Sequence, residues 1–123
     1  MNSYKDLFVW QRSMDLVESI YRITALFPTD ERFGLISQMR RAAVSIPANI
    51  AEGRRRGTRR DYHHFVVMAY GSGAELETHL EISRRLNFVS DEGIEQLSHL
   101  LTEVMKMLNS LSSKLREPTS VSD

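Results

Sequence analysis

Apolar residues recur at helical spacing along nearly the whole chain, and the last third shows the pattern most clearly. From residue 94 onward they alternate steps of three and four: Ile94, Leu97, Leu101, Val104, Leu108, Leu111 and Leu115. Such a seam predicts an amphipathic helix. Ser90 is a suitable N-cap for it, with Asp91 and Glu92 in the first turn, and Pro118 stops it. We expect a helix over about residues 91–116.

The first segment carries two apolar stripes on one predicted helix, which begins after the capping pattern Ser3-x-x-Asp6 and stops at Pro28. One stripe comprises Leu7, Trp10, Met14, Val17, Tyr21 and Thr24, and the other comprises Val9, Leu16, Ile20, Ile23 and Phe27. A helix of a small monomeric bundle needs only one apolar face. The surplus indicates either a broad core face or burial of one stripe against a second copy of the chain.

The second segment has a proline inside its apolar pattern. After Asp30 it places Ile36, Met39, Ala43, Ile46 and Ile50 at helical spacing, and we expect it to end at Gly53, a favourable residue after a C-cap. Pro47 removes one backbone hydrogen bond and crowds the preceding turn, at roughly 3 kcal/mol. Because the apolar spacing continues on both sides, we predict a single helix kinked at Pro47.

The third segment opens on Thr58-x-x-Asp61, another capping pattern, and we expect a helix from about residue 59 to residue 86, with Asn87 after its C-cap. Gly71 and Gly73 in its middle are each about 1 kcal/mol less favourable than alanine in an exposed helix. Close approach to the small side chains of the second segment would offset that cost. The alternative is a loop at residues 71–73 that divides two helices; we predict the continuous helix.

Four helices joined by short connections predict an all-α fold, an antiparallel up-down-up-down four-helix bundle. We assign residues 1–117 to one bundle domain and residues 118–123 to a disordered C-terminal tail. The sequence shows no internal repeat and no low-complexity tract.

Composition narrows the classes of function. The chain has no cysteine, which excludes disulfides, zinc–cysteine sites and thiol nucleophiles. Its longest apolar run is the six residues 65–70, too short to span a bilayer, and its first residues do not resemble a secretory signal. These features predict a cytoplasmic protein. The net charge is zero, yet residues 1–70 carry 11 basic and 7 acidic residues, whereas residues 71–123 carry 5 and 9.

Arginines are concentrated between the second and third predicted helices. Arg54, Arg55, Arg56, Arg59 and Arg60 place five positive charges within seven residues, next to Gly53 and Gly57. Arginine forks, flexible backbone and a helix N-terminus together favour a phosphate ligand. We therefore take these five, together with Arg40 and Arg41, as candidate nucleic-acid-binding residues. The alternatives are a solvated turn, or charges that pair with acids of another subunit.

The four histidines give no clear catalytic or metal site. His63 and His64 are adjacent, so on a helix they point about 100° apart. His79 follows Glu75 by four residues, for which an ordinary surface pair is the simplest interpretation, and His99 is expected to be solvated. No Glu-x-x-His motif of a di-iron bundle is present. We expect no metal, no cofactor and no small-molecule substrate.

Catalytic motifs are equally sparse. No phosphate-binding loop or nucleophile elbow occurs, and Ser72, between two glycines, has no recognisable base partner. Arg59 and His64 match the Arg-x4-6-His spacing of the all-helical ribonucleases of the HEPN class, although the residue after Arg59 is another arginine where that class favours a small polar one. We predict a protein that is not an enzyme, with a HEPN-like ribonuclease as the third hypothesis.

One long block carries a resemblance to a known family. Most specific is the block Gln38-Met-Arg-Arg-Ala-Ala-Val-Ser-Ile-Pro-Ala-Asn-Ile-Ala-Glu-Gly53, joined by Leu7-x-Val-Trp-Gln11, Ile20-Tyr21, Phe27-Pro28, Glu31, Gly34-Leu35 and Gly71-Ser-x-Ala-Glu-Leu-Glu77. From about residue 4 to residue 115 the chain resembles the intervening-sequence protein family, also called the four-helix bundle protein family. Its first members were found encoded inside intervening sequences of bacterial 23S ribosomal RNA genes.

The resemblance implies a bacterial protein that forms a homo-oligomer, a ring-shaped pentamer, which would bury the second apolar stripe of the first helix. A more distant branch, the accessory variability proteins of diversity-generating retroelements, binds reverse transcriptase and nucleic acid. The partners we expect are therefore the chain itself and either RNA or a nucleoprotein such as a reverse transcriptase. A purely protein–protein assembly is the runner-up. That branch is strongly basic, whereas this chain has zero net charge.

Overall fold

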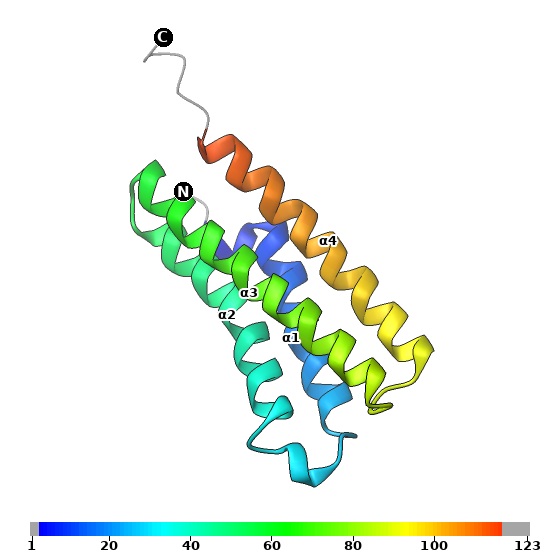
Figure 1. Ribbon diagram of the computed structural model, residues 1–123. Helices are drawn as coiled ribbons and strands as arrows, with labels where there is room; N and C mark the ends of the chain where they lie inside the picture. Colours follow the sequence, from blue (N-terminus) through cyan, green and yellow to red (C-terminus); the bar gives the residue numbers. More distant parts are fainter. Residues whose placement is uncertain (1–2, 117–123) are drawn as a thin grey trace.

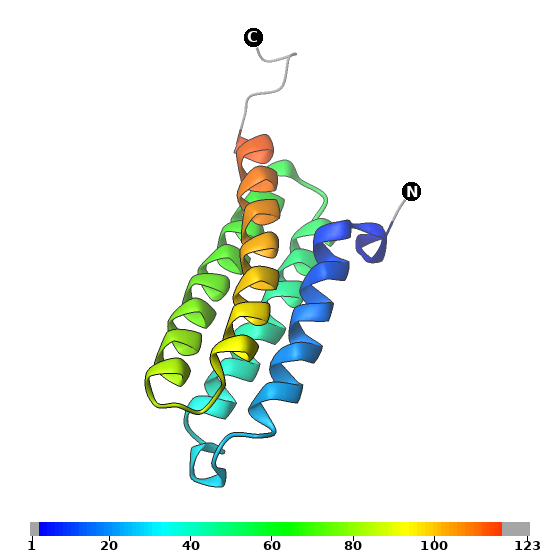
Figure 2. The ribbon, with the colours of Figure 1, turned by 90° about the vertical axis from the view of Figure 1, so that its right-hand side faces the viewer.

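The computed structural model describes residues 3–116 of the chain. In chain order the elements are a 3-10 helix η1 (Tyr4–Asp6), α1 (Phe8–Thr24), a 3-10 helix η2 (Thr29–Glu31), α2 (Leu35–Arg55), α3 (Arg59–Arg85) and α4 (Asp91–Arg116). The four α-helices run alternately up and down, as Figures 1 and 2 show. Each packs on two neighbours, α1 on α2 and α4, and α3 on α2 and α4. The predicted four-helix bundle is confirmed; the predicted tail, residues 118–123, lies outside the described residues.

Two helix starts follow the capping residues predicted from the sequence. Thr58 is the N-cap of α3, and its side chain accepts a hydrogen bond from the Asp61 amide at 3.1 Å. Ser90 does the same for the Gly93 amide at 3.1 Å, ahead of α4. Asn87, after the end of α3, has a φ of 61°, the left-handed conformation that asparagine tolerates. These polar residues fix where the long helices α3 and α4 begin and where α3 ends.

Two other predicted boundaries were wrong. Ser3 caps η1 through a 3.1 Å bond from the Lys5 amide, and α1 begins only at Phe8 with no side-chain cap. Gly53 does not end α2, which continues to Arg55. The left-handed residue of the connection is Gly57, with a φ of 87°. Both sequence errors came from treating the first suitable residue as the helix boundary.

Gly53 is required for a different reason, the close packing of α2 on α3. A Cβ atom at Gly53 would lie 2.7 Å from the Cβ of Phe65 and 3.3 Å from the Tyr62 carbonyl oxygen. A side chain as small as alanine's would therefore push the two helices apart. About two turns further along the interface, the hydroxyl groups of Ser45 and Ser72 form a 2.7 Å hydrogen bond between the same helices.

The glycines in the middle of α3 have separate roles. The helix is continuous through both, so the predicted continuous helix is confirmed and the loop is not present. A Cβ at Gly73 would lie 2.2 Å from the Met105 sulfur, so Gly73 makes room for α4, not for α2 as expected. Gly71 faces open space, where a Cβ would meet nothing within 4 Å.

Helix α2 runs unbroken through Pro47, which is buried. The prediction of one helix is confirmed; the kink stays a prediction. Near the proline, the Asn49 side-chain amide donates to the Ser45 carbonyl at 2.8 Å and to its hydroxyl at 2.9 Å. Asn49 thus supplies hydrogen bonds to the turn in which the proline has removed a backbone donor.

The second apolar stripe of the first segment, which starts at Val9, supplies its main contribution to the core. Of that stripe, Val9, Leu16, Ile20 and Phe27 are buried and Ile23 packs against them. Of the first stripe, Leu7, Trp10 and Val17 pack against the core from its side, and Thr24 is buried. Most of both stripes therefore lies against the core, as the broad-core interpretation expects, whereas Phe8 and Tyr21 of α1 are 61% and 42% exposed.

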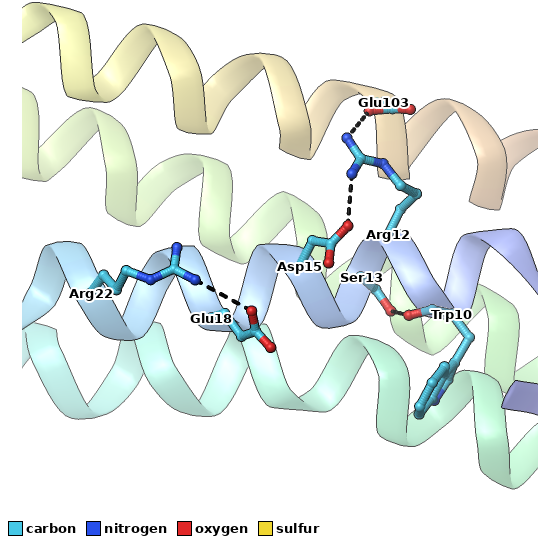
Figure 3. A network of polar contacts seen from close by, with 7 residues as sticks. All are labelled: Trp10, Arg12, Ser13, Asp15, Glu18, Arg22 and Glu103. Carbon is cyan, nitrogen blue, oxygen red and sulfur yellow. Dashed lines mark hydrogen bonds and ion pairs between the residues drawn. The ribbon is translucent and has the colours of Figure 1, made fainter.

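A network of ion pairs joins α1 to α4 (Figure 3). The Arg12 guanidinium, on α1, contacts Asp15 and, across the interface, Glu103 of α4, each at 2.7 Å. The hydrogen bond from Arg12 lowers the pKa of Glu103.

Helices long and apolar enough to cross a membrane are not found among residues 3–116.

Candidate functional site

Positive charge gathers at one end of the bundle, the upper end in Figures 1 and 2. Here η1, the end of α2, the start of α3 and the end of α4 converge, and we call residues 4–8, 52–62 and 112–116 the basic end. It carries eight basic side chains, Lys5, Arg54, Arg55, Arg56, Arg59, Arg60, Lys114 and Arg116, and three acidic ones, Asp6, Glu52 and Asp61. The excess of five positive charges stands in a chain whose net charge is zero.

The other end of the bundle is nearly balanced. We call residues 21–38 and 81–94 the opposite end. It carries the four basic residues Arg22, Arg32, Arg84 and Arg85 and the five acidic residues Asp30, Glu31, Glu81, Asp91 and Glu92. Glu81 accepts hydrogen bonds from both Arg84 and Arg85, at 2.6–3.0 Å. These bonds lower the pKa of Glu81 to about 2.

Arg59 joins the start of α3 to the end of α4 by hydrogen bonds. Its Nε donates to the Leu115 carbonyl at 3.1 Å, and a terminal nitrogen donates to the Lys114 carbonyl. The last carbonyls of a helix have no partner within it, so Arg59 caps the C-terminus of α4 from the start of α3. Its guanidinium therefore has a structural task that the sequence did not reveal.

Two arginines of the basic end lie over aromatic rings. The Arg55 guanidinium lies 5.5 Å from the centre of the Tyr4 ring. Arg56 lies 5.0 Å from the centre of the Phe65 ring, and its Nε donates to Glu52 at 2.8 Å. Arg60 is exposed and makes no hydrogen bond or ion pair within residues 3–116. Arg55, Arg56 and Arg60 are thus presented to solvent at the surface of this end.

A shallow hollow of about 250 Å³ opens between these segments. It is lined by Gly53, Arg54, Gly57, Thr58, Arg59, Tyr62 and Leu115. Burial raises the pKa of Tyr62, an effect that the nearby positive charge of Arg54 opposes. The hollow brings residues of α2, α3 and α4 into one concave surface on the basic end.

Arg40 and Arg41 lie elsewhere. Arg40 is 14 residues before Arg54 on the same helix, about 20 Å away at helical rise. Its Nε donates to the Thr24 hydroxyl at 2.9 Å, and its guanidinium lies 4.5 Å from the centre of the Tyr21 ring. Arg41 is exposed nearer the middle of α2. Of the seven candidate arginines, the structure brings five together and separates these two from them.

Sequence reasoning missed Lys5, Lys114 and Arg116. Each is far in sequence from the arginine cluster and reaches it only because antiparallel helices end side by side. An up-down topology brings the end of the second helix to the same end of the bundle as the start of the first and the end of the fourth. The predicted up-down topology, combined with the positions of the basic residues in the sequence, therefore predicts that Lys5, Lys114 and Arg116 lie at the same end as the arginine cluster.

The histidines at the start of α3 have different surroundings. His63 Nε2 lies 3.2 Å from the Ser112 hydroxyl, and His64 is exposed beside the Phe65 ring. Arg59 donates to the Leu115 carbonyl at the end of α4, and His64 packs on the Phe65 ring. These contacts do not join the arginine and the histidine of the Arg-x4-6-His spacing. Among residues 3–116, no three His, Asp or Glu side chains gather as a metal site requires.

His79 is buried, so the expected surface pair with Glu75 was wrong. Only 6% of His79 is exposed, and its Nδ1 has no hydrogen-bond partner among the described residues. Its Nε2 lies 3.7 Å from Glu75. Burial lowers the pKa of His79; Glu75 opposes that shift and Arg41 adds to it. Burial of His79 in the α3 packing thus favours its uncharged form.

Comparison with known proteins decides the family. The profile described as 23S rRNA-intervening sequence protein matches residues 5–110. The chain belongs to this family. A similar solved structure is the crystal structure of a protein with unknown function from the S23 ribosomal protein family of Bacteroides thetaiotaomicron VPI-5482. It shares 26% identity with a TM-score of 0.79, covering 85% of this chain and 95% of that one. No curated protein matches the chain significantly.

Membership of the 23S rRNA-intervening sequence protein family confirms the resemblance drawn from the Gln38–Gly53 block. The matched range contains that block and the whole connection between α2 and α3. Six of the eight basic residues of the basic end, Lys5 and the five arginines from Arg54 to Arg60, therefore fall inside it. Lys114 and Arg116 lie beyond it.

Proposed function

We propose that this protein is a non-enzymatic, self-associating four-helix bundle that binds nucleic acid, RNA foremost, through its basic end. The observation that carries the proposal is the excess of five positive charges on one end of a chain with zero net charge. Lys and Arg contacts to phosphates supply most of the affinity of nucleic-acid binding. The words 23S rRNA in the family's description make RNA the first nucleic acid to test.

Helix energetics support a role other than stability for part of this charge. Arg59 and Arg60 occupy the first turn of α3. The positive end of the helix dipole disfavours cations there. Arg59 is offset by its bonds to the end of α4, but Arg60 has no such bond within the described residues. An anionic ligand at the basic end would interact favourably both with Arg60 and with the positive end of the α3 dipole.

Self-association is supported by apolar side chains that the single chain leaves uncovered. On the packed pair α2 and α3, counting the C-cap of α3, between 40% and 52% of the residue is exposed at Val44, Val67, Met68, Tyr70, Ile82 and Leu86. Scattered exposed apolar residues are ordinary, but six on two adjacent helices favour a protein contact. A homopentamer would repeat the basic end five times and multiply weak contacts to a polyanion. Light scattering tests this: a monomer at micromolar concentration contradicts it.

These same side chains favour the second candidate, an assembly that binds only protein. The ribonuclease hypothesis is the third, since Arg59 is occupied at the end of α4. Incubation with RNA under metal-free conditions separates it from the others. RNA turnover that His64→Ala abolishes would establish an enzyme, whereas intact RNA is the result we expect.

The direct test of RNA binding compares the wild-type protein with Arg54→Ala/Arg55→Ala/Arg56→Ala over a range of salt concentrations. Removal of three phosphate-binding cations is expected to weaken binding by about tenfold or more and to flatten its salt dependence. Circular dichroism checks that the variant remains helical. Equal and negligible binding by both proteins would refute the proposal and leave the protein-only assembly.

A further inference from the structure

Aromatic rings alternate with arginines across the end of α2. On one side η1 and α1 contribute Tyr4 and Trp10, and on the other α3 contributes His64 and Phe65. Arg55 and Arg56, the last residue of α2 and its C-cap, stand between the two aromatic groups. At the opposite end Arg84 and Arg85 pair with Glu81, and one arginine–aromatic pair occurs there, with Arg32 5.6 Å from the centre of the Phe33 ring.

The pair on the α1 side is held in place by a second ring. Tyr4 packs edge-to-face on Trp10, with ring centres 5.4 Å apart and an angle of 65°. Trp10 is partly buried against the core, on the opposite side of α1 from Arg12 (Figure 3). A ring fixed in this way gives the Arg55 guanidinium, 5.5 Å from its centre, a defined position.

The pair on the α3 side is fixed by a different set of contacts. Phe65 lies against Gly53 of α2 and packs edge-to-face with His64, with ring centres 5.3 Å apart. Arg56 lies 5.0 Å from the Phe65 centre and is held from its other direction by Glu52. Both arginines remain exposed, although each rests on a ring.

A guanidinium that lies over an aromatic ring and stays exposed, as Arg55 and Arg56 do, keeps part of its planar surface open to solvent. Unpaired nucleic-acid bases stack on such planes, whereas the bases of a duplex are already stacked on one another and are closed to them. Charge alone predicts the reverse preference, because a duplex has a higher density of phosphates than a single strand. The two mechanisms can therefore be told apart by which form binds more tightly.

We propose that the basic end binds unpaired nucleotides, whose bases stack on the two arginine–aromatic pairs Arg55–Tyr4 and Arg56–Phe65 while the remaining cations contact the phosphates. This inference rests on the proposed nucleic-acid-binding function and adds the form of nucleic acid that is recognised. Single-stranded RNA is the expected ligand.

The experiment uses fluorescence anisotropy with three labelled probes of equal length, about 12 nucleotides, within the size range of single-strand sites. They are an unpaired RNA strand, a strand of abasic residues with the same phosphates, and a fully paired RNA duplex. A single-stranded DNA of the same sequence is a fourth arm that tests dependence on the sugar. We expect the wild-type protein to bind the unpaired RNA about tenfold more tightly than the abasic strand or the duplex.

The decisive variant is Arg55→Lys/Arg56→Lys, which keeps both charges and removes both flat surfaces. It should bind the unpaired strand only as tightly as the abasic one, with affinity for the abasic strand unchanged. The matched control is Arg60→Lys/Arg116→Lys, the same exchange at two exposed arginines that lie over no ring within the described residues, and it should keep the tenfold preference. All four substitutions are at the surface, so the fold is not at risk.

The outcomes separate this inference from the proposed function. If the wild-type protein binds all the probes equally well and in a salt-dependent manner, the basic end is an electrostatic site and stacking is refuted. If it prefers the duplex, stacking is refuted as well. If it binds none of them, the nucleic-acid-binding function itself fails, and this inference fails with it.

Discussion

The two ends of the bundle are built from the same kinds of helix termini, yet they differ in the balance of basic and acidic residues. At the opposite end, Arg84 and Arg85 share the carboxylate of Glu81. At the basic end, eight basic residues face three acidic ones, and Arg55 rests on a ring instead of an acid. The fold requires helix ends at both places. It does not require an excess of charge at one of them.

Helix α3 shows the contrast within one element. Arg84 and Arg85 occupy its last turn, where the helix dipole favours cations, and Arg59 and Arg60 occupy its first turn, where it does not. The arginines of the opposite end thus agree with what stability alone would select. Those of the basic end do not all agree with it, and the proposed binding of an anionic ligand would account for the difference.

The largest effect is expected from breaking the scaffold of the basic end with Gly53→Ala. The new Cβ would lie 2.7 Å from the Phe65 Cβ, an atom that cannot move without its helix. We expect a loss of about 2 kcal/mol or more in the free energy of unfolding, and a melting temperature lower by about 10 °C. Thermal unfolding followed by circular dichroism measures this.

Gly71→Ala is the matched control, because it makes the same chemical change where a Cβ meets nothing within 4 Å. Helix propensity should then dominate and stabilise the protein by up to about 1 kcal/mol. Destabilisation by both substitutions to a similar extent would show that the close packing of α2 on α3 at Gly53 is not the cause.

A second effect concerns pH and the half of the molecule away from the basic end. Because burial lowers the pKa of His79 below its unfolded value, the unfolded chain binds a proton that the folded chain does not. Stability should therefore be complete above the unfolded pKa of about 6.5 and should fall as the pH drops from there toward the lowered folded pKa. Urea unfolding at a series of pH values between about 7.5 and 5.5 tests this.

His79→Leu, which removes the buried imidazole, should lose this part of the pH dependence. His99→Ala, a change at an exposed histidine, should retain it. A pH profile of His79→Leu that matches the wild type would mean that the pKa of His79 is the same in the folded and the unfolded chain, because Glu75, 3.7 Å away, offsets burial.

The smallest effect is expected from single arginines at the two ends of α3. Arg60→Ala should stabilise the protein by about 0.3 kcal/mol, because it removes a cation from the unfavourable end of the dipole. Arg85→Ala should destabilise it by a similar amount, because it removes a favourable cation and a bond to Glu81. Chemical denaturation of both variants in parallel resolves the sign, and equal signs would contradict the dipole argument.

Much of the fold follows from sequence because its signals are local. The apolar seam of α4 and the caps at Thr58 and Ser90 depend on residues within a few turns, and they gave those helix boundaries closely. Gly53 and Gly73 could be recognised as unusual but not explained. Their reasons are Phe65 and Met105, on other helices, and only the packed structure shows which neighbour comes close.

The part of the candidate site that lies in one stretch of the chain could be predicted from the sequence. The contacts that this stretch makes with distant segments could not. The cluster from Arg54 to Arg60 is visible in the sequence, but the role of Arg59 as a cap for α4 depends on carbonyls more than 50 residues away. The same is true of the ring beneath Arg55, which comes from Tyr4. Charge density can be read locally; the partner of each charge cannot.

The most direct test of the account compares RNA binding after matched changes at the two ends. Arg55→Ala/Arg60→Ala removes two exposed arginines from the basic end, and Arg22→Ala/Arg32→Ala removes two from the opposite end. The first pair should weaken RNA binding by about tenfold or more and reduce the slope of log affinity against log salt by roughly 1.4, while the second should change neither. Equal losses from both pairs would contradict the claim that the basic end is the binding site.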